Sequence, residues 1–148
     1  MSFQCAGKAA ASHGSMWDME ARPQDRLKAL RNGLLRLHKY LLDSERASYE
    51  RDVERITSTG QYLNLVVNDP FFNWLRELSQ FIVVVDETLD LEEPATAVDA
   101  DRLIARARDL VAPAENGDGF GRRYYEAMQR DPGVVLAHRD MVRVFSGL

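Results

Sequence analysis

The sequence predicts an all-α protein, a single-domain helical bundle of five or six helices. Apolar residues recur at three- and four-residue steps along most of the chain, which is the spacing of a buried helical face. Residues suited to capping a helix stand before these periodic segments, and we assign no segment to a strand. With 148 residues, the chain has the length of one domain with a real core.

We expect a helix at about 70–91 to lie at the centre of the bundle, because residues 68–90 hold the densest apolar run in the chain. Asp69 suits the N-cap, and Pro70 suits the first turn, where its missing N–H would have no intrahelical partner. The alternative is a strand at 81–85, where β-branched residues gather. The helix is favoured because the apolar stripe continues in phase on both sides of this stretch.

The segments before this helix divide into a tail and a long helix. Residues 1–22 are small, polar and aperiodic, so we expect a flexible N-terminal tail followed by a helical domain at 23–148. In the range 25–56, leucines keep a heptad-like spacing, and this predicts a long amphipathic helix. Its other side carries mixed charges, as a solvated helix face does.

The remaining helices are each introduced by a capping pattern or a turn. A capping box, in which a Ser or Thr is followed three residues later by an acidic or amide side chain, satisfies free backbone N–H groups at a helix start. The helix starts that we expect are Ser58 to Gln61, Thr96 to Asp99, the glycine-rich loop 113–121 and Asp131-Pro132.

Composition and charge restrict the classes of function. The formal net charge of −4 argues against a nucleic-acid-binding protein, which usually carries a basic surface. Cys5 is the only cysteine, so the chain can form neither an internal disulfide nor a thiolate metal cage. No apolar run has the length of a membrane span and the N-terminus lacks a secretory signal, so we expect a cytoplasmic protein without a membrane partner.

Several polar side chains fall on the expected inner faces when each helix is projected at about 100° per residue. Burying such groups without partners is costly, so they are expected to meet one another or other polar groups. The candidate ligand-binding residues are His38, Glu45, Tyr49, Asp86 and His138.

Three interpretations of this interior set remain open: a metal site, a site for a small organic ligand or for chemistry, and a hydrogen-bonded polar core. Helical bundles do build metal sites in this way. However, His38 and Glu45 lie about 10.5 Å apart along a helix axis, too far to hold one ion comfortably. We therefore favour a polar core in which Glu45 pairs with an arginine, assign no metal ligand and name no cofactor.

A second candidate is the loop from Gly117 to Arg123. Backbone N–H groups at a helix start, beside two arginines, can hold a phosphate. The segment lacks the preceding strand of a dinucleotide fingerprint and the Lys and Ser/Thr of a P-loop. The alternative is a flexible loop that ends in a cap at Asp118. The candidate anion-binding residues are Gly119, Gly121, Arg122 and Arg123.

The function we expect is association with a protein partner or with a second copy, without catalysis. The chain has no Gly-x-Ser-x-Gly nucleophile elbow, and its one cysteine lies in the tail. More aromatic residues occur than one buried stripe accommodates, so either other helices surround the central helix or part of its surface meets another chain. The candidate interface residues are Phe71, Phe72, Trp74, Tyr124 and Tyr125. The alternative function is a bundle that binds a metal or small ligand through the interior set.

Overall fold

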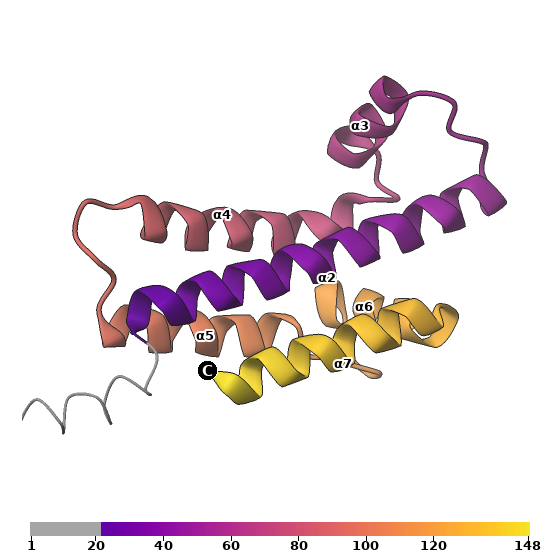
Figure 1. The fold of residues 1–148 in the computed structure, drawn as a ribbon. Coiled ribbons are helices and arrows are strands. Elements are labelled where there is room, and N and C mark those ends of the chain that lie inside the picture. Colours follow the sequence, from indigo (N-terminus) through magenta and orange to yellow (C-terminus); the bar gives the residue numbers. More distant parts are fainter. Residues whose placement is uncertain (1–21) are drawn as a thin grey trace, which may run out of the picture.

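The computed structural model describes residues 22–148, which form six α-helices, one short 3₁₀ helix and no strand (Figure 1). The helices are α2 (Pro23–Asp52), α3 (Thr59–Asn68), η1 (Asn73–Leu75), α4 (Arg76–Asp90), α5 (Ala97–Leu110), α6 (Gly119–Arg130) and α7 (Pro132–Gly147). The all-α prediction is therefore confirmed. The predicted tail at 1–22 lies outside the described residues, apart from Arg22. None of these helices combines the length and the apolar character needed to cross a membrane.

Helix α2 lies at the centre of the arrangement. Its 30 residues span about 45 Å at 1.5 Å per residue, long enough to serve several shorter neighbours. It packs against α4, α5 and α7, and Figure 1 shows it (purple) running between α4 and α7. The bundle prediction is confirmed as a fold class, but α2 takes the central position that we expected for the helix at about 70–91.

Three of the predicted helix starts have the expected capping contacts. The hydroxyl of Ser58 accepts from the backbone N–H of Gln61 at 3.1 Å. Thr96 and Asp99 form a full capping box, in which each side chain accepts from the other residue's N–H at 3.1 Å. Asp131 accepts from the N–H two residues ahead at 2.8 Å. These contacts satisfy N–H groups that have no intrahelical partner.

The helix expected at 70–91 starts later than predicted. Asp69 accepts from the N–H of Phe71 at 2.8 Å and closes a turn, which η1 follows before α4 begins at Arg76. This bend turns the ring of Phe72 into contact with Tyr49, at a centroid distance of 5.7 Å. The strand alternative at 81–85 is wrong, because these residues lie inside α4.

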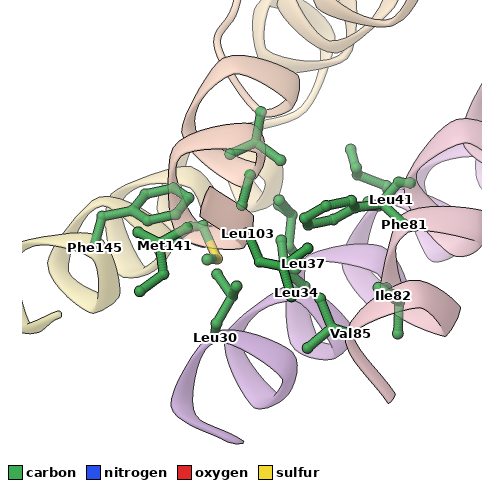
Figure 2. Packing of buried hydrophobic residues seen from close by; sticks show 14 of the residues in the cluster. Leu30, Leu34, Leu37, Leu41, Phe81, Ile82, Val85, Leu103, Met141 and Phe145 are labelled. Atoms are coloured by element: carbon green, nitrogen blue, oxygen red, sulfur yellow. The ribbon is translucent and has the colours of Figure 1, made fainter. Parts of the chain in front are cut away.

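The main core forms around the leucines of α2. The predicted leucine row is confirmed, because its five members are at most 1% exposed: Leu27, Leu30, Leu34, Leu37 and Leu41. Figure 2 shows their side chains meeting apolar residues from α4, α5 and α7. The labelled members are Leu30, Leu34, Leu37, Leu41, Phe81, Ile82, Val85, Leu103, Met141 and Phe145.

A second, smaller cluster attaches α3. Its buried members are Tyr49, Ile56 and Phe72, and α3 contributes only partly buried residues to it. No residue of α3 is buried, and the helix stands off from the other helices beside the end of α2 (Figure 1). The fold therefore joins a well-packed bundle to one loosely covered helix.

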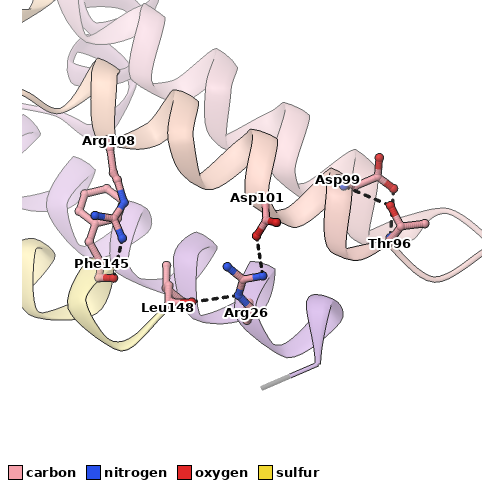
Figure 3. Close-up of polar contacts among 7 residues, drawn as sticks. All are labelled: Arg26, Thr96, Asp99, Asp101, Arg108, Phe145 and Leu148. Atoms are coloured by element: carbon pink, nitrogen blue, oxygen red, sulfur yellow. Dashed lines mark hydrogen bonds and ion pairs between the residues drawn. The ribbon is translucent and has the colours of Figure 1, made fainter. Parts of the chain in front are cut away.

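The carboxyl end of α7 is held by two arginines from other helices (Figure 3). Arg26 of α2 donates to the carbonyl of Leu148 at 3.1 Å, and Arg108 of α5 donates to the carbonyl of Phe145 at 2.9 Å. The last carbonyls of a helix lack intrahelical partners and carry the negative end of its dipole. Arg26 also pairs with Asp101 at 2.9 Å, which ties α2, α5 and α7 together.

Gly33 marks the close approach of α2 and α7, and its substitution tests this packing. A Cβ at Gly33 would lie 3.2 Å from the sulfur of Met141 and 3.3 Å from Val144. We expect Gly33→Ala to be nearly neutral, because the methionine can move and alanine favours the helix. Gly33→Leu is expected to lower the free energy of unfolding by about 1–3 kcal/mol through overpacking, measured by urea denaturation.

The matched control is Gly147→Ala at the end of α7, where a Cβ would meet nothing within 4 Å. We expect this substitution to leave the stability unchanged or to raise it slightly, because alanine has the higher helix propensity. Wild-type stability in Gly33→Leu would contradict the packing of α2 on α7.

Candidate functional site

Glu45 is the only charged side chain among the buried residues of the described chain, at 2% exposure. Its Oε1 accepts from Nη2 of Arg130 at 2.6 Å, and Arg130 is the last residue of α6. The predicted pairing of Glu45 with an arginine is confirmed. A carboxylate withdrawn from water in this way depends on its partner, so the ion pair joins α2 to the corner between α6 and α7.

His138 and Tyr124 form a second polar pair inside the fold. Tyr124 is fully buried, and its hydroxyl lies 2.8 Å from Nδ1 of His138. Burial raises the pKa of Tyr124 well above its ordinary value and lowers the pKa of His138. At neutral pH the phenol O–H therefore donates to a neutral imidazole. The interpretation of His138 as a hydrogen-bonded histidine is confirmed.

The other interior candidates lie elsewhere. Asp86 pairs with Arg31 at 3.4 Å, and its side chain is 43% exposed, so the prediction that it points inward is wrong. It stands at the edge of α4, whose buried face is made by other positions. Tyr49 belongs to the aromatic cluster under α3. His38 is half-buried beside α3 and α4, and burial lowers its pKa.

The predicted ligand-binding residues therefore do not meet in one site. Glu45 and His138 each bond to a different partner, and Asp86 lies at the surface. Within residues 22–148, no three His, Cys, Asp or Glu side chains are grouped to hold a metal ion. The physical reason is that positions seven apart share a helix side but face different neighbours along its length.

The arginines of the candidate anion site have contacts within the fold. Arg122 donates to Glu126 at 2.9 Å and also to the carbonyl of Glu115. The guanidinium of Arg123 lies 5.7 Å from the ring centroid of Trp74. The Arg122 contacts fasten the loop to the start of α6, whereas Arg123 is exposed and contacts only the face of Trp74.

The glycines of the same loop have structural reasons to be glycine. Gly119 has φ +69°, a conformation that residues with a Cβ rarely adopt. A Cβ on Gly121 would lie 2.9 Å from the carbonyl oxygen of Ala112, too close for any side chain. Asp118 occupies the N-cap position of α6, although its side chain makes no capping hydrogen bond. The glycine pattern thus reports backbone geometry, which the sequence alone cannot distinguish from a phosphate cradle.

The aromatic candidates for an interface are mostly inside the chain. Phe72 is 1% exposed and Tyr124 is fully buried, so their assignment to a docking surface is wrong. Phe71, Trp74 and Tyr125 are half-buried. Aromatic residues outside the main stripe are used within the fold, where Tyr62 of α3 packs on Phe72 and Trp74 of η1 packs on Phe120 of α6.

Helix α3 has the exposed apolar surface that the aromatic residues lack. It is the only described α-helix without a charged residue, and none of its residues is buried. Leu63 and Val67 are 58% and 59% exposed, one helical turn apart. Gly60 and Asn64 lie on the same exposed side. We name these four residues the α3 surface.

A groove lies beside the α3 surface, between α2, α3 and α4. Its lining residues are His38, Val66, Val67, Phe72, Leu75, Arg76, Ser79 and Gln80. Arg76 donates to the carbonyl of Val67 at 2.7 Å and ties the end of α3 to α4. The hydroxyl of Ser79 donates to the carbonyl of Arg76 at 3.0 Å, so it is not oriented as a nucleophile toward His38. The groove is suited to apolar side chains with a few polar groups at its edge.

Sequence reasoning included His38 but missed the α3 surface. The signal was present, because residues 56–68 contain no charged side chain. Comparison with protein-family models, curated proteins and solved structures finds no match to this chain. The residues and their geometry therefore carry the functional argument.

The ion pair between Glu45 and Arg130 predicts an asymmetric response to mutation. We expect Arg130→Met to lower the free energy of unfolding by about 3 kcal/mol, because it leaves a buried carboxylate without a partner. Glu45→Gln should cost about 1–2 kcal/mol, since Arg130 is partly exposed and can be solvated. Urea denaturation of both variants and of Glu45→Met/Arg130→Met measures the coupling. A double variant less stable than Arg130→Met alone would contradict this account.

The two described histidines predict a loss of stability in mild acid. Burial lowers the pKa of His38 and His138 from 6.5, so below this value the unfolded chain binds more protons than the folded one. Stability should hold above about pH 6.5 and fall as the pH drops below it, measured by thermal unfolding. His138→Asn keeps an acceptor for Tyr124 but does not titrate, so it should flatten this slope, and His38→Asn should do so separately. An unchanged slope in the double variant would contradict the assignment.

Proposed function

We propose that this protein acts by association with a second copy of itself through the α3 surface and the adjoining groove, without catalysis. The observation that carries this proposal is an uncharged helix with no buried residue. A surface helix normally has a charged face opposite its apolar stripe. At the chain average of 28% charged residues, about three charged residues would be expected among the ten of α3. Their absence favours a surface that another protein covers.

The spacing of the α3 surface fits helix packing. Gly60, Leu63, Asn64 and Val67 stand at relative positions i, i+3, i+4 and i+7, the spacing of residues that dock a helix on an apolar partner. Nothing lies within 4 Å of a Cβ placed on Gly60, so a neighbouring backbone can approach there. Covering Leu63 and Val67 would contribute about 1.5–3 kcal/mol each if they became fully buried.

The size of the contact extends the interface beyond α3. A ten-residue helix is about 15 Å long, too short to supply the roughly 800 Å² per partner of a stable interface. The adjoining groove adds apolar area from Val66, which is half-buried. Val83 on α4 and Leu35 on α2, which are 51% and 44% exposed, offer further apolar contacts on the two helices that border this groove.

A second copy suits this surface because α3 carries no charge. In a two-fold dimer the same patch meets itself, so a charge close to the two-fold axis would face its own copy. Packing α3 against α3 brings Leu63 and Val67 of each copy together and creates no such repulsion. The fit with a second copy is the reason we prefer self-association to a different partner.

The test is the molar mass in solution, measured by size-exclusion chromatography with light scattering. We expect the wild type to exceed the 16.8 kDa of one chain with a dependence on concentration, and Leu63→Asp/Val67→Asp to run as a monomer. Both substitutions lie on exposed positions, so circular dichroism and the melting temperature should be retained.

The matched control is Val135→Asp/Val142→Asp on α7, where the valines are 42% and 46% exposed. This variant should keep the mass of the wild type. A wild type that stays monomeric at the highest attainable concentration would rule out the second copy as the partner. Equal dissociation of the control would place the contact elsewhere on the surface.

A further inference from the structure

A second groove runs between α4 and α5 and adjoins the groove beside α3 at Gln80. It consists of two stretches that share Val84 and Arg106. The lining residues are Glu77, Gln80, Phe81, Val84, Thr88 and Leu91 from α4 and its end, and Asp99, Arg102, Leu103, Arg106, Asp109 and Leu110 from α5. From position 77 to position 91 the groove is about 21 Å long at 1.5 Å per residue.

The end of this groove at Leu91 combines an exposed apolar side chain with two arginines. Leu91 is 64% exposed, and Val84 is half-buried. The guanidinium of Arg106 lies 5.2 Å from the ring centroid of Phe81, and Arg106 makes no ion pair within residues 22–148. Arg102 bonds to Asp99 at 2.9 Å at the same end. Glu77 and Asp109 line the other stretch of the groove, so an apolar side chain flanked by acidic residues matches the end at Leu91, beside Arg106, and not the opposite end.

The first turn of α2 places the start of the described chain at this end. The side chain of Gln24 donates to the carbonyl of Leu89 at 3.2 Å and accepts from the N–H of Ala95 at 3.0 Å. These two bonds fasten the start of α2 to the end of α4 and to the connection before α5. The described chain therefore begins beside the end of α4.

The sequence just before this point has the matching chemistry. Residues 16–20 read Met-Trp-Asp-Met-Glu, so the indole of Trp17 is flanked by two methionines, with Asp18 and Glu20 as the acidic members. Trp17 lies five positions before Arg22, so in extended chain its Cα is at most about 18 Å from that of Arg22.

We propose that residues 16–20 of the chain dock in the groove between α4 and α5. Trp17 packs against Val84, and Asp18 and Glu20 face Arg102 and Arg106. Burial of the indole supplies most of the stabilisation, because partly exposed ion pairs contribute little. The charges set the register instead, since a like charge at either position would be repelled. This proposal is independent of the dimer contact on α3.

The test measures the tryptophan fluorescence of Trp17 in a variant that has no other tryptophan. The chain has two tryptophans, so the full-length Trp74→Phe variant reports on Trp17 alone. We expect its emission to be blue-shifted and protected from acrylamide. Adding Arg102→Glu/Arg106→Glu should shift the emission to the red and raise the quenching constant several-fold. A further exchange, Asp18→Arg/Glu20→Arg, should restore the protection.

The matched control is Arg36→Glu/Arg139→Glu, which makes the same charge change at exposed positions outside the groove. It should leave the emission unchanged. A second measurement avoids the Trp74 substitution: amide hydrogen exchange of the full chain should be faster at 77–91 and 99–110 in Trp17→Ser than in the wild type.

The outcomes separate this proposal from its alternatives. Solvent-exposed Trp17 emission before any groove substitution, or equal exchange in Trp17→Ser and the wild type, would overturn it. Protection that is lost on dilution would assign the groove to the segment of a second copy, and this too would overturn docking within one chain. Repeating the measurement in Leu63→Asp/Val67→Asp keeps the result separate from the α3 dimer, because each contact can fail without the other.

Discussion

The leucine row of α2 is the contact on which the rest of the structure depends. Five leucines from Leu27 to Leu41 are almost completely buried, and each contributes about 1.5–3 kcal/mol relative to exposure. One neighbouring helix cannot cover the row along its length, so α4, α5 and α7 share it. Their other contacts follow from this arrangement, including the close approach at Gly33 and the arginines that hold the end of α7.

Polar and aromatic contacts replace aliphatic ones in the second half of α2. Glu45 bonds to Arg130, and Tyr49 packs on Phe72 in a small cluster of its own. Helix α3 depends on this cluster and has no buried residue, so it draws little stability from the main core. Elements attached in this way are often the ones used for binding, because a partner can cover them without disturbing the core. The proposed dimer contact uses this division between a stable bundle and a loosely covered helix.

The polar residues that sequence patterns assign to the interior do not form one cluster, and those that form polar contacts each bond to a separate partner. Glu45 and His138 each find a single partner that no local pattern indicates, since Arg130 lies 85 positions from Glu45. Asp86 lies beside the buried face of α4, not on it, so its side chain is partly exposed. A helical projection gives the angular position of each residue about one helix axis. It does not show which neighbouring helix packs against each side. The candidate cluster failed for this reason, while the alternative of paired polar groups was correct.

Local rules were enough to establish the helical class, the leucine row and most helix starts, because periodicity and capping act within one or two turns. The sequence also contained the uncharged run of α3, although its exposure could not be read from it. Tertiary structure decided that α2 is the central helix, that Phe72 and Tyr124 are buried, and that Leu63 and Val67 are exposed. These outcomes depend on contacts between helices that are far apart in the sequence. A side chain is buried only when such a neighbour covers it.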